Sequence, residues 1–178
     1  MLDIEKCSLV VIDVQGKLAM LMYDRDALFK NIQILIKAAK LLDIPVLWSQ
    51  QCPAALGPTV PEIAELLADN EPIDKTNFSC CGDAQFIRKL NFNRPQILLS
   101  GIETHVCIYQ TAADLRDKGF TVNVIADAVS SRTLDNKQIA ITKMQMAGIN
   151  IYSTEMVLFE LLKTADHPHF KQIAKLVK

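Results

Sequence analysis

The sequence predicts a three-layer α/β/α fold in which a doubly wound, six-stranded parallel sheet lies between helices. Short runs rich in Val, Ile and Leu recur along the chain, as expected of parallel strands that are buried on both faces. Longer amphipathic stretches separate these runs. Right-handed crossovers in such β-α repeats place helices on both faces of one sheet.

The first half of the chain supplies three strands. We predict them at 8–13, 45–49 and 73–76. Residues 25–42 carry an apolar stripe with helical spacing, and Asp24 can cap that helix. A surface loop at 53–61 contains Pro and Gly, and a short helix at 62–68 follows it.

The second half continues the alternation. Its strands are predicted at 96–100, 121–126 and 149–152. Its helices are predicted at 83–90, 106–118, 135–147, 155–163 and 167–178. Gly119 and Gly148 follow two of these helices, where a left-handed residue is favoured, and Thr154 is a candidate N-cap.

Composition indicates one globular domain over residues 1–178, since half of the residues are hydrophobic and 22% are charged. The formal net charge is −1 and the basic residues are spread out, so we expect no nucleic-acid partner. The apolar run at 8–14 is too short to span a membrane, and acidic flanks do not suit a signal peptide. We therefore expect no membrane partner and a cytoplasmic location.

The cysteines do not form a framework of disulfides or a zinc site. They are odd in number and lack paired C-x-x-C spacing, and they occupy positions 7, 52, 80, 81 and 107. We expect free thiols and no metal or other cofactor.

Candidate catalytic residues lie where ligands bind such sheets, beyond the carboxyl ends of the strands and near the switch point between strands one and four. Asp13 closes the first strand, Lys75 ends the third, and Cys107 opens the helix after the fourth. A helix N-terminus and a nearby lysine both favour a thiolate. Together these residue types could carry out acyl-type hydrolysis, with a thiolate nucleophile, a carboxylate for proton transfer and backbone amides for the oxyanion.

Three motifs resemble those of the isochorismatase-like cysteine hydrolases. SGIETHVCIYQTAADLRDKG (100–119) resembles that family's nucleophile segment, and VVIDVQ (10–15) and DKTNFS (74–79) are similar to its Asp- and Lys-bearing motifs. Order and spacing agree across nearly the whole chain, and LGPTVPEI (56–63) resembles a subgroup of uncharacterised members. The resemblance implies a single domain with the Rossmann-like isochorismatase hydrolase fold.

The resemblance also implies residue roles. Cys107 would be the nucleophile, Asp13 the general acid and base, and Lys75 the cation that lowers the pKa of the thiol. A cis peptide bond between Ile102 and Glu103 is implied as well. It would aim an amide into an oxyanion hole beside the Cys107 amide.

Nicotinamidase members of the family bind a metal through Asp and His side chains near the second strand. The corresponding stretch here, WSQQCPAALG (48–57), contains no His, so a metal and nicotinamidase activity are both disfavoured. Isochorismatase proper cleaves a vinyl ether without a cysteine nucleophile. Cys107 therefore favours hydrolysis of a C–N bond, amide or carbamoyl, through a covalent thioester-type intermediate.

Candidate substrate contacts are Gln15, Trp48, Phe78 and Thr104. Gln15 shares a face with Asp13 if the first strand continues, and aromatic residues at such positions also commonly pack in cores. The expected partners are a small-molecule substrate and further copies of the chain, as a dimer or tetramer. Two other functions stay open: a catalytically silent scaffold or binding protein, and a redox-sensing thiol protein in which folding brings Cys80 or Cys81 close to Cys107.

Overall fold

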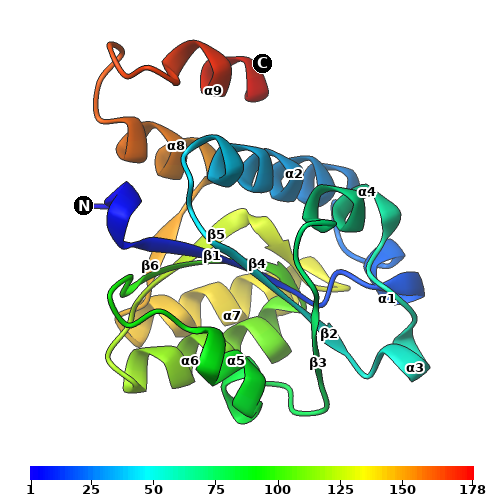
Figure 1. The fold of residues 1–178 in the computed structure, drawn as a ribbon. Helices are drawn as coiled ribbons and strands as arrows, with labels where there is room; N and C mark the ends of the chain where they lie inside the picture. Colours follow the sequence, from blue (N-terminus) through cyan, green and yellow to red (C-terminus); the bar gives the residue numbers. More distant parts are fainter.

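The computed structural model describes residues 1–178 and contains one six-stranded sheet (Figure 1). All neighbouring strands are parallel, and the order across the sheet is β3-β2-β1-β4-β5-β6. The strands are β1 (Cys7–Ile12), β2 (Val46–Gln51), β3 (Ile73–Lys75), β4 (Gln96–Ile102), β5 (Thr121–Ser130) and β6 (Asn150–Tyr152). The predicted doubly wound parallel sheet is confirmed.

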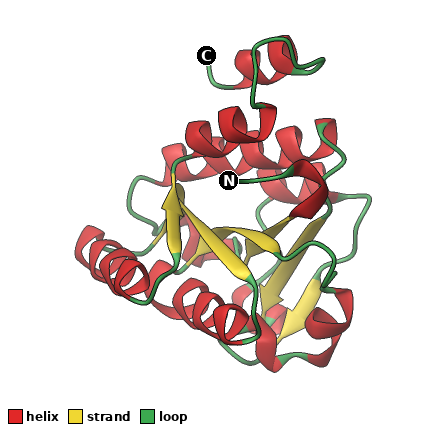
Figure 2. Ribbon diagram, turned by 90° about the vertical axis from the view of Figure 1, so that its left-hand side faces the viewer, coloured by secondary structure: helices red, strands yellow, loops and turns green.

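Helices cover both faces of the sheet, as Figures 1 and 2 show. One layer contains α2 (Arg25–Leu41), α4 (Pro61–Ala64) and α8 (Thr154–Leu162), and α9 (Phe170–Leu176) lies on the outer side of this layer. The opposite layer contains α5 (Ala84–Lys89), α6 (Tyr109–Asp117) and α7 (Leu134–Met146). Two short helices, α1 (Gly16–Met20) and α3 (Pro53–Leu56), lie near the carboxyl ends of β1 and β2. None of the helices combines the length and apolar character that a membrane crossing requires.

Side-chain alternation along the strands divides the interior into two apolar clusters, one on each face of the sheet. Leu9 and Val11 of β1 belong to the cluster beneath α2 and α8. Val10 and Ile12 belong to the cluster against α5, α6 and α7. Both faces of a central strand are therefore buried, which explains why this segment is a continuous apolar run.

Local signals were less reliable than the sheet pattern. Asp24 does not cap α2 with its side chain, because it adopts a left-handed conformation (φ 48°). Ser153, rather than Thr154, caps α8 by accepting the N–H of Met156. The loop predicted at 53–61 contains α3, and the helix predicted from residue 106 starts earlier, as a π-helical turn η4 (Thr104–Ile108).

The switch point lies at β1, which has β2 on one side and β4 on the other. Close approach of β1 and β4 depends on Gly101, whose φ is +118°. A Cβ atom at this position would lie 2.1 Å from the main-chain oxygen of Ile12. Glycine is therefore required where the two strands reach the edge that carries the candidate site.

Candidate active site

Asp13 directly follows β1, and its backbone turns sharply away from the sheet. Its φ is +55°, a left-handed conformation that Asp tolerates better than most residues. Its N–H donates to the main-chain oxygen of Ser49, so the turn is tied to β2. The Asp13 residue is only 3% exposed, which places a carboxylate inside the protein.

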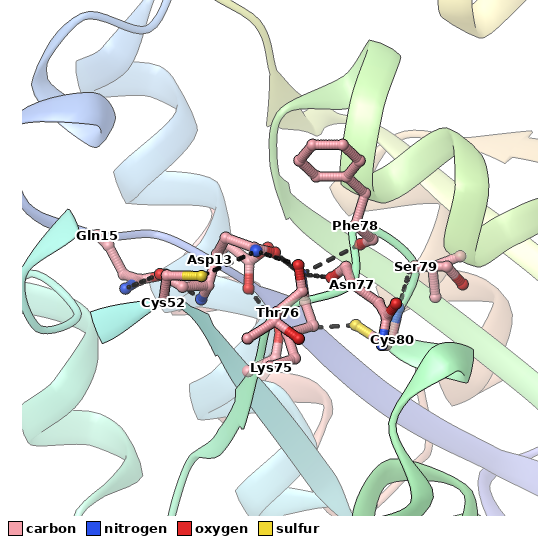
Figure 3. A network of polar contacts seen from close by, with 12 residues as sticks. Asp13, Gln15, Cys52, Lys75, Thr76, Asn77, Phe78, Ser79 and Cys80 are labelled. Atoms are coloured by element: carbon pink, nitrogen blue, oxygen red, sulfur yellow. Dashed lines mark hydrogen bonds and ion pairs between the residues drawn. The ribbon is translucent and has the colours of Figure 1, made fainter. Parts of the chain in front are cut away.

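Lys75 ends β3 and pairs with this carboxylate. Its Nζ lies 2.6 Å from Asp13 Oδ2, and its side chain has no exposed surface. Nζ also donates to Gln51 Oε1 at 2.7 Å and to the main-chain oxygens of Asn77 and Phe78 (Figure 3). Burying a cation is costly unless it is paired and hydrogen-bonded, and Lys75 meets both conditions.

Opposing effects act on the pKa of Lys75. Burial by itself lowers the pKa of the ammonium group, whereas the adjacent Asp13 carboxylate raises it. The net pKa is raised, so Lys75 is a cation at neutral pH. The buried pair therefore carries two opposite charges that largely cancel.

Cys107 lies within the π-helical turn η4, is 7% exposed and forms part of the core cluster beside α6. Burial raises the pKa of its thiol from 9.0 to about 12, Asp13 adds to the increase, and Lys75 opposes it. The pKa of the Cys107 thiol is thus raised overall, although Lys75 acts on it in the expected direction. The lowering by Lys75 is smaller than the combined increase from burial and from the Asp13 charge.

The peptide bond between Ile102 and Glu103 is cis, at the bond where the family resemblance implies one. Ile102 is the last residue of β4, and the main-chain oxygen of Glu103 accepts the N–H groups of Val106 and Ile108. The Glu103 carboxylate accepts hydrogen bonds from the backbone N–H and Nε of Arg132, beyond β5. The Glu103 side chain thus links the start of η4 to the neighbouring strand end.

Two predicted substrate contacts are engaged elsewhere. Gln15 is fully buried, and its side chain donates to the oxygens of Gln51 and Gly57 and accepts the N–H of Gln51. The indole of Trp48 packs in the cluster beneath α2 and donates to Asn70 O. Its side chain faces away from Ser49, its neighbour on β2, because successive residues of a strand point to opposite faces. Both side chains thus have partners within the protein, and contact of either with a substrate stays a prediction.

The other two predicted contacts lie next to the site. Phe78 is 54% exposed, and its ring stands off the polar network in Figure 3 while its main-chain oxygen holds Lys75. Thr104 is fully buried in η4, and its hydroxyl has no hydrogen-bond partner. Contact of either residue with a substrate stays a prediction.

Two residues that contact the catalytic candidates were missed from the sequence, and a third, Cys80, was considered only for a redox role. Ser49 donates to Asp13 Oδ1 at 2.7 Å, Gln51 accepts from Lys75, and the Cys80 thiol donates to Ser49 Oγ. Ser49 and Gln51 are two residues apart at the carboxyl end of β2, so they share a face next to β1. That spacing was the available signal.

The residues at the end of β2 do not form the metal site expected of nicotinamidases. No group of three or more His, Cys, Asp or Glu side chains is arranged to hold a metal ion. Gln50 Nε2 donates to Asp74, and Gln51 Nε2 donates to Thr76 O. The amide side chains at this strand end are therefore already committed within the protein.

A six-stranded parallel sheet with helices on both faces is the fold of isochorismatase-like hydrolases. Residues 7–156 match the model of the isochorismatase domain. The chain therefore belongs to the isochorismatase family.

Relatives extend over nearly the whole chain. The secreted isochorismatase effector Isc1 of Phytophthora sojae is 40% identical over 176 residues, covering 96% of this chain and 83% of that protein. Isochorismatase domain-containing protein 2 of Danio rerio is 37% identical over 171 residues, covering 95% and 85%. The solved structure of the MAR1 ribonuclease from Caenorhabditis elegans has a TM-score of 0.93 and 37% identity, covering 99% and 91%.

Proposed function

We propose that this member of the family hydrolyses a C–N bond, amide or carbamoyl, in a small molecule, with Cys107 as nucleophile. The observation that carries the proposal is the position of the Asp13 carboxylate. It bonds the Lys75 ammonium at 2.6 Å, and its charge also acts on the Cys107 thiol. A nucleophile, a proton acceptor and a fixed cation thus occupy one buried site.

The first half of the reaction forms a thioester and releases an amine. Because burial keeps Cys107 as a thiol, its proton moves to Asp13 as Sγ attacks the carbonyl carbon. Asp13 then gives that proton to the leaving nitrogen as the C–N bond breaks. Lys75 holds the carboxylate in place and compensates its charge.

The second half returns the enzyme to its starting state. Asp13 removes a proton from water, the hydroxide attacks the thioester carbon, and the C–S bond breaks. The proton on Asp13 passes to the Cys107 sulfur, and the acid product leaves. The backbone amides of Glu103 and Cys107 are our candidates for stabilising the oxyanion in both halves.

Burial of the trio favours a small substrate. Cys107 is 7% exposed, and Asp13 and Lys75 are 3% and 2% exposed. Phe78, with its exposed ring next to the site, is the candidate for contact with an apolar part of the substrate. Only a compact acyl group can approach such a nucleophile.

Cleavage of RNA is a second candidate, because the nematode relative with 37% identity is named a ribonuclease. Charge weighs against it. The formal net charge of this chain is −1, and every N–H of the Lys75 ammonium is used within the protein. We therefore rank small-molecule hydrolysis first.

We further propose a cytoplasmic location and self-association. All five cysteines are free, which suits a reducing compartment. The outer face of α7 exposes two large apolar side chains, Ile139 at 67% and Met146 at 83%. Sedimentation at several protein concentrations would show whether the chain forms the proposed dimer or tetramer.

The experiment uses a panel of primary amides and carbamoyl compounds, with mass spectrometry of rapidly quenched protein. We expect an acyl adduct on Cys107 and complete loss of hydrolysis in Cys107→Ala. Cys7→Ala is the matched control, because it removes a buried thiol at the opposite, amino end of β1. Hydrolysis that persists in Cys107→Ala, or cleavage of RNA by a chain that hydrolyses none of the panel, would contradict the proposal.

A further inference from the structure

Both oxygens of the Asp13 carboxylate have a donor from a neighbouring strand. Oδ2 accepts from Lys75 of β3, and Oδ1 accepts from the hydroxyl of Ser49 of β2 at 2.7 Å. Ser49 is 2% exposed, so no water competes freely for this bond. Hydrogen bonds to a buried carboxylate favour its charged form.

Ser49 in turn accepts a hydrogen bond from a second buried side chain. The Cys80 thiol donates to Ser49 Oγ at 3.6 Å and is fully buried. Burial raises the pKa of this thiol to about 11, so it keeps its proton at neutral pH. The backbone N–H of Cys80 donates to Thr111 Oγ1 at 3.0 Å. Thr111 belongs to α6, the helix that continues from the turn carrying Cys107.

The direction of this line of hydrogen bonds follows from counting protons. Ser49 has one hydroxyl proton, which it gives to Asp13, so its oxygen is free to accept from Cys80. The sequence of donors is therefore Cys80 to Ser49 to Asp13. The bond from Cys80 polarises the Ser49 hydroxyl, which makes that hydroxyl a stronger donor to Asp13.

We propose that Ser49 and Cys80 are positioning residues that set how readily Asp13 takes and gives its proton. The inference rests on the proposed role of Asp13 in proton transfer. The charged and titratable groups around this carboxylate are Lys75 from β3, Cys107 from η4 and Cys80 from the short turn Cys80–Gly82. Of the residues bonded to Asp13, only Ser49 is uncharged at every pH, which makes it the cleanest site to change.

The sign of the effect follows from the same physics. Without the Ser49 hydroxyl, Oδ1 loses its donor, and the charged carboxylate is less favoured than in the parent. The rate at which Cys107 is alkylated should fall at low pH, and we call this part of the pH profile the acid limb. In Ser49→Ala the acid limb should therefore move to higher pH. Cys80→Ala should give a smaller shift in the same direction, because it acts through Ser49.

The test measures the rate at which iodoacetamide alkylates Cys107, located by mass spectrometry, over an acid-to-neutral pH series. The reference is Asp13→Asn, which should lack the acid limb. We expect a shift of about one pH unit for Ser49→Ala and about a third of that for Cys80→Ala. The conservative variant Ser49→Thr keeps the hydroxyl donor, and Cys80→Ser replaces the thiol donor with a hydroxyl, so both should restore the parent profile.

The outcomes separate the two proposals. If Ser49→Ala and Cys80→Ala match the parent profile while Asp13→Asn loses the acid limb, the positioning role is wrong and the role of Asp13 stands. If Asp13→Asn reacts like the parent, the proposed role of Asp13 itself fails. A purely structural role for Ser49 would lower the melting temperature and, by loosening the site, raise the alkylation rate without moving the acid limb.

Discussion

Two ion pairs of similar length lie in different surroundings. Lys75 Nζ and Asp13 Oδ2 are 2.6 Å apart, and Lys40 Nζ and Asp69 Oδ2 are 2.8 Å apart. The side chains of the first pair are 0% and 3% exposed, whereas those of the second are 42% and 82% exposed. The distance between the two charged atoms therefore does not by itself indicate how much an ion pair contributes to the stability of the protein. The buried pair is part of a network of fixed donors and acceptors, and the exposed pair exchanges with water.

The largest expected effect comes from breaking the buried pair. Lys75→Met leaves the Asp13 carboxylate buried without its cation, which should lower the free energy of unfolding by about 3–5 kcal/mol. Urea unfolding followed by circular dichroism measures this change. Lys40→Met makes the same chemical change at the exposed pair and should leave the unfolding midpoint almost unchanged.

A double variant sharpens the interpretation. In Lys75→Met with Asp13→Asn, no uncompensated charge remains, so part of the lost stability should return. Amide hydrolysis should be absent from both the single and the double variant. If the double variant is less stable than Lys75→Met alone, the loss arises from packing and not from a buried charge.

An alkaline pH series tests the thiols of the same buried region. The pKa of Cys107 is raised to about 12 and that of Cys80 to about 11, from an ordinary value of 9.0, in each case first by burial. The unfolded chain therefore loses these protons first. Stability should be constant below about pH 9 and fall as pH rises toward 11 and 12.

The expected readout is a melting temperature that falls by several degrees between about pH 8 and about pH 10.5. Cys107→Ala removes one of the responsible groups and should flatten the dependence. A slope that is the same in Cys107→Ala and the parent would show that this thiol is not held in its protonated form.

The smallest expected effect concerns the exposed pair. The hydrogen bond from Lys40, together with its charge, lowers the pKa of Asp69, but the carboxylate is open to solvent. Asp69→Asn should therefore leave the melting temperature unchanged within measurement error, at low and at high salt. A clear loss of stability that disappears in high salt would show that the surface pair matters more than its exposure indicates.

The sequence indicated some of the residues that meet at the candidate site and not others, and the reason differs between residues. Asp13 and Lys75 were found because polar residues at the carboxyl ends of strands stand out against apolar runs. Ser49 and Gln51 were missed because uncharged polar side chains at the end of a strand do not by themselves indicate proton transfer. The sequence also did not show that Trp48 packs beneath α2, because the face of a strand residue follows from the register of the folded sheet.

The sequence by itself determined the parallel sheet, its helical layers and the membership of the family, because hydrophobic periodicity and three ordered motifs are local properties of the chain. Only the tertiary structure decided the electrostatics of the site. It showed that Lys75 is paired with Asp13 and that burial disfavours the thiolate form of Cys107. It also showed that Ser49 donates a hydrogen bond to Asp13 and accepts one from Cys80. The physical reason is that a pKa depends on burial and on charges brought close by folding, here across 62 residues of sequence.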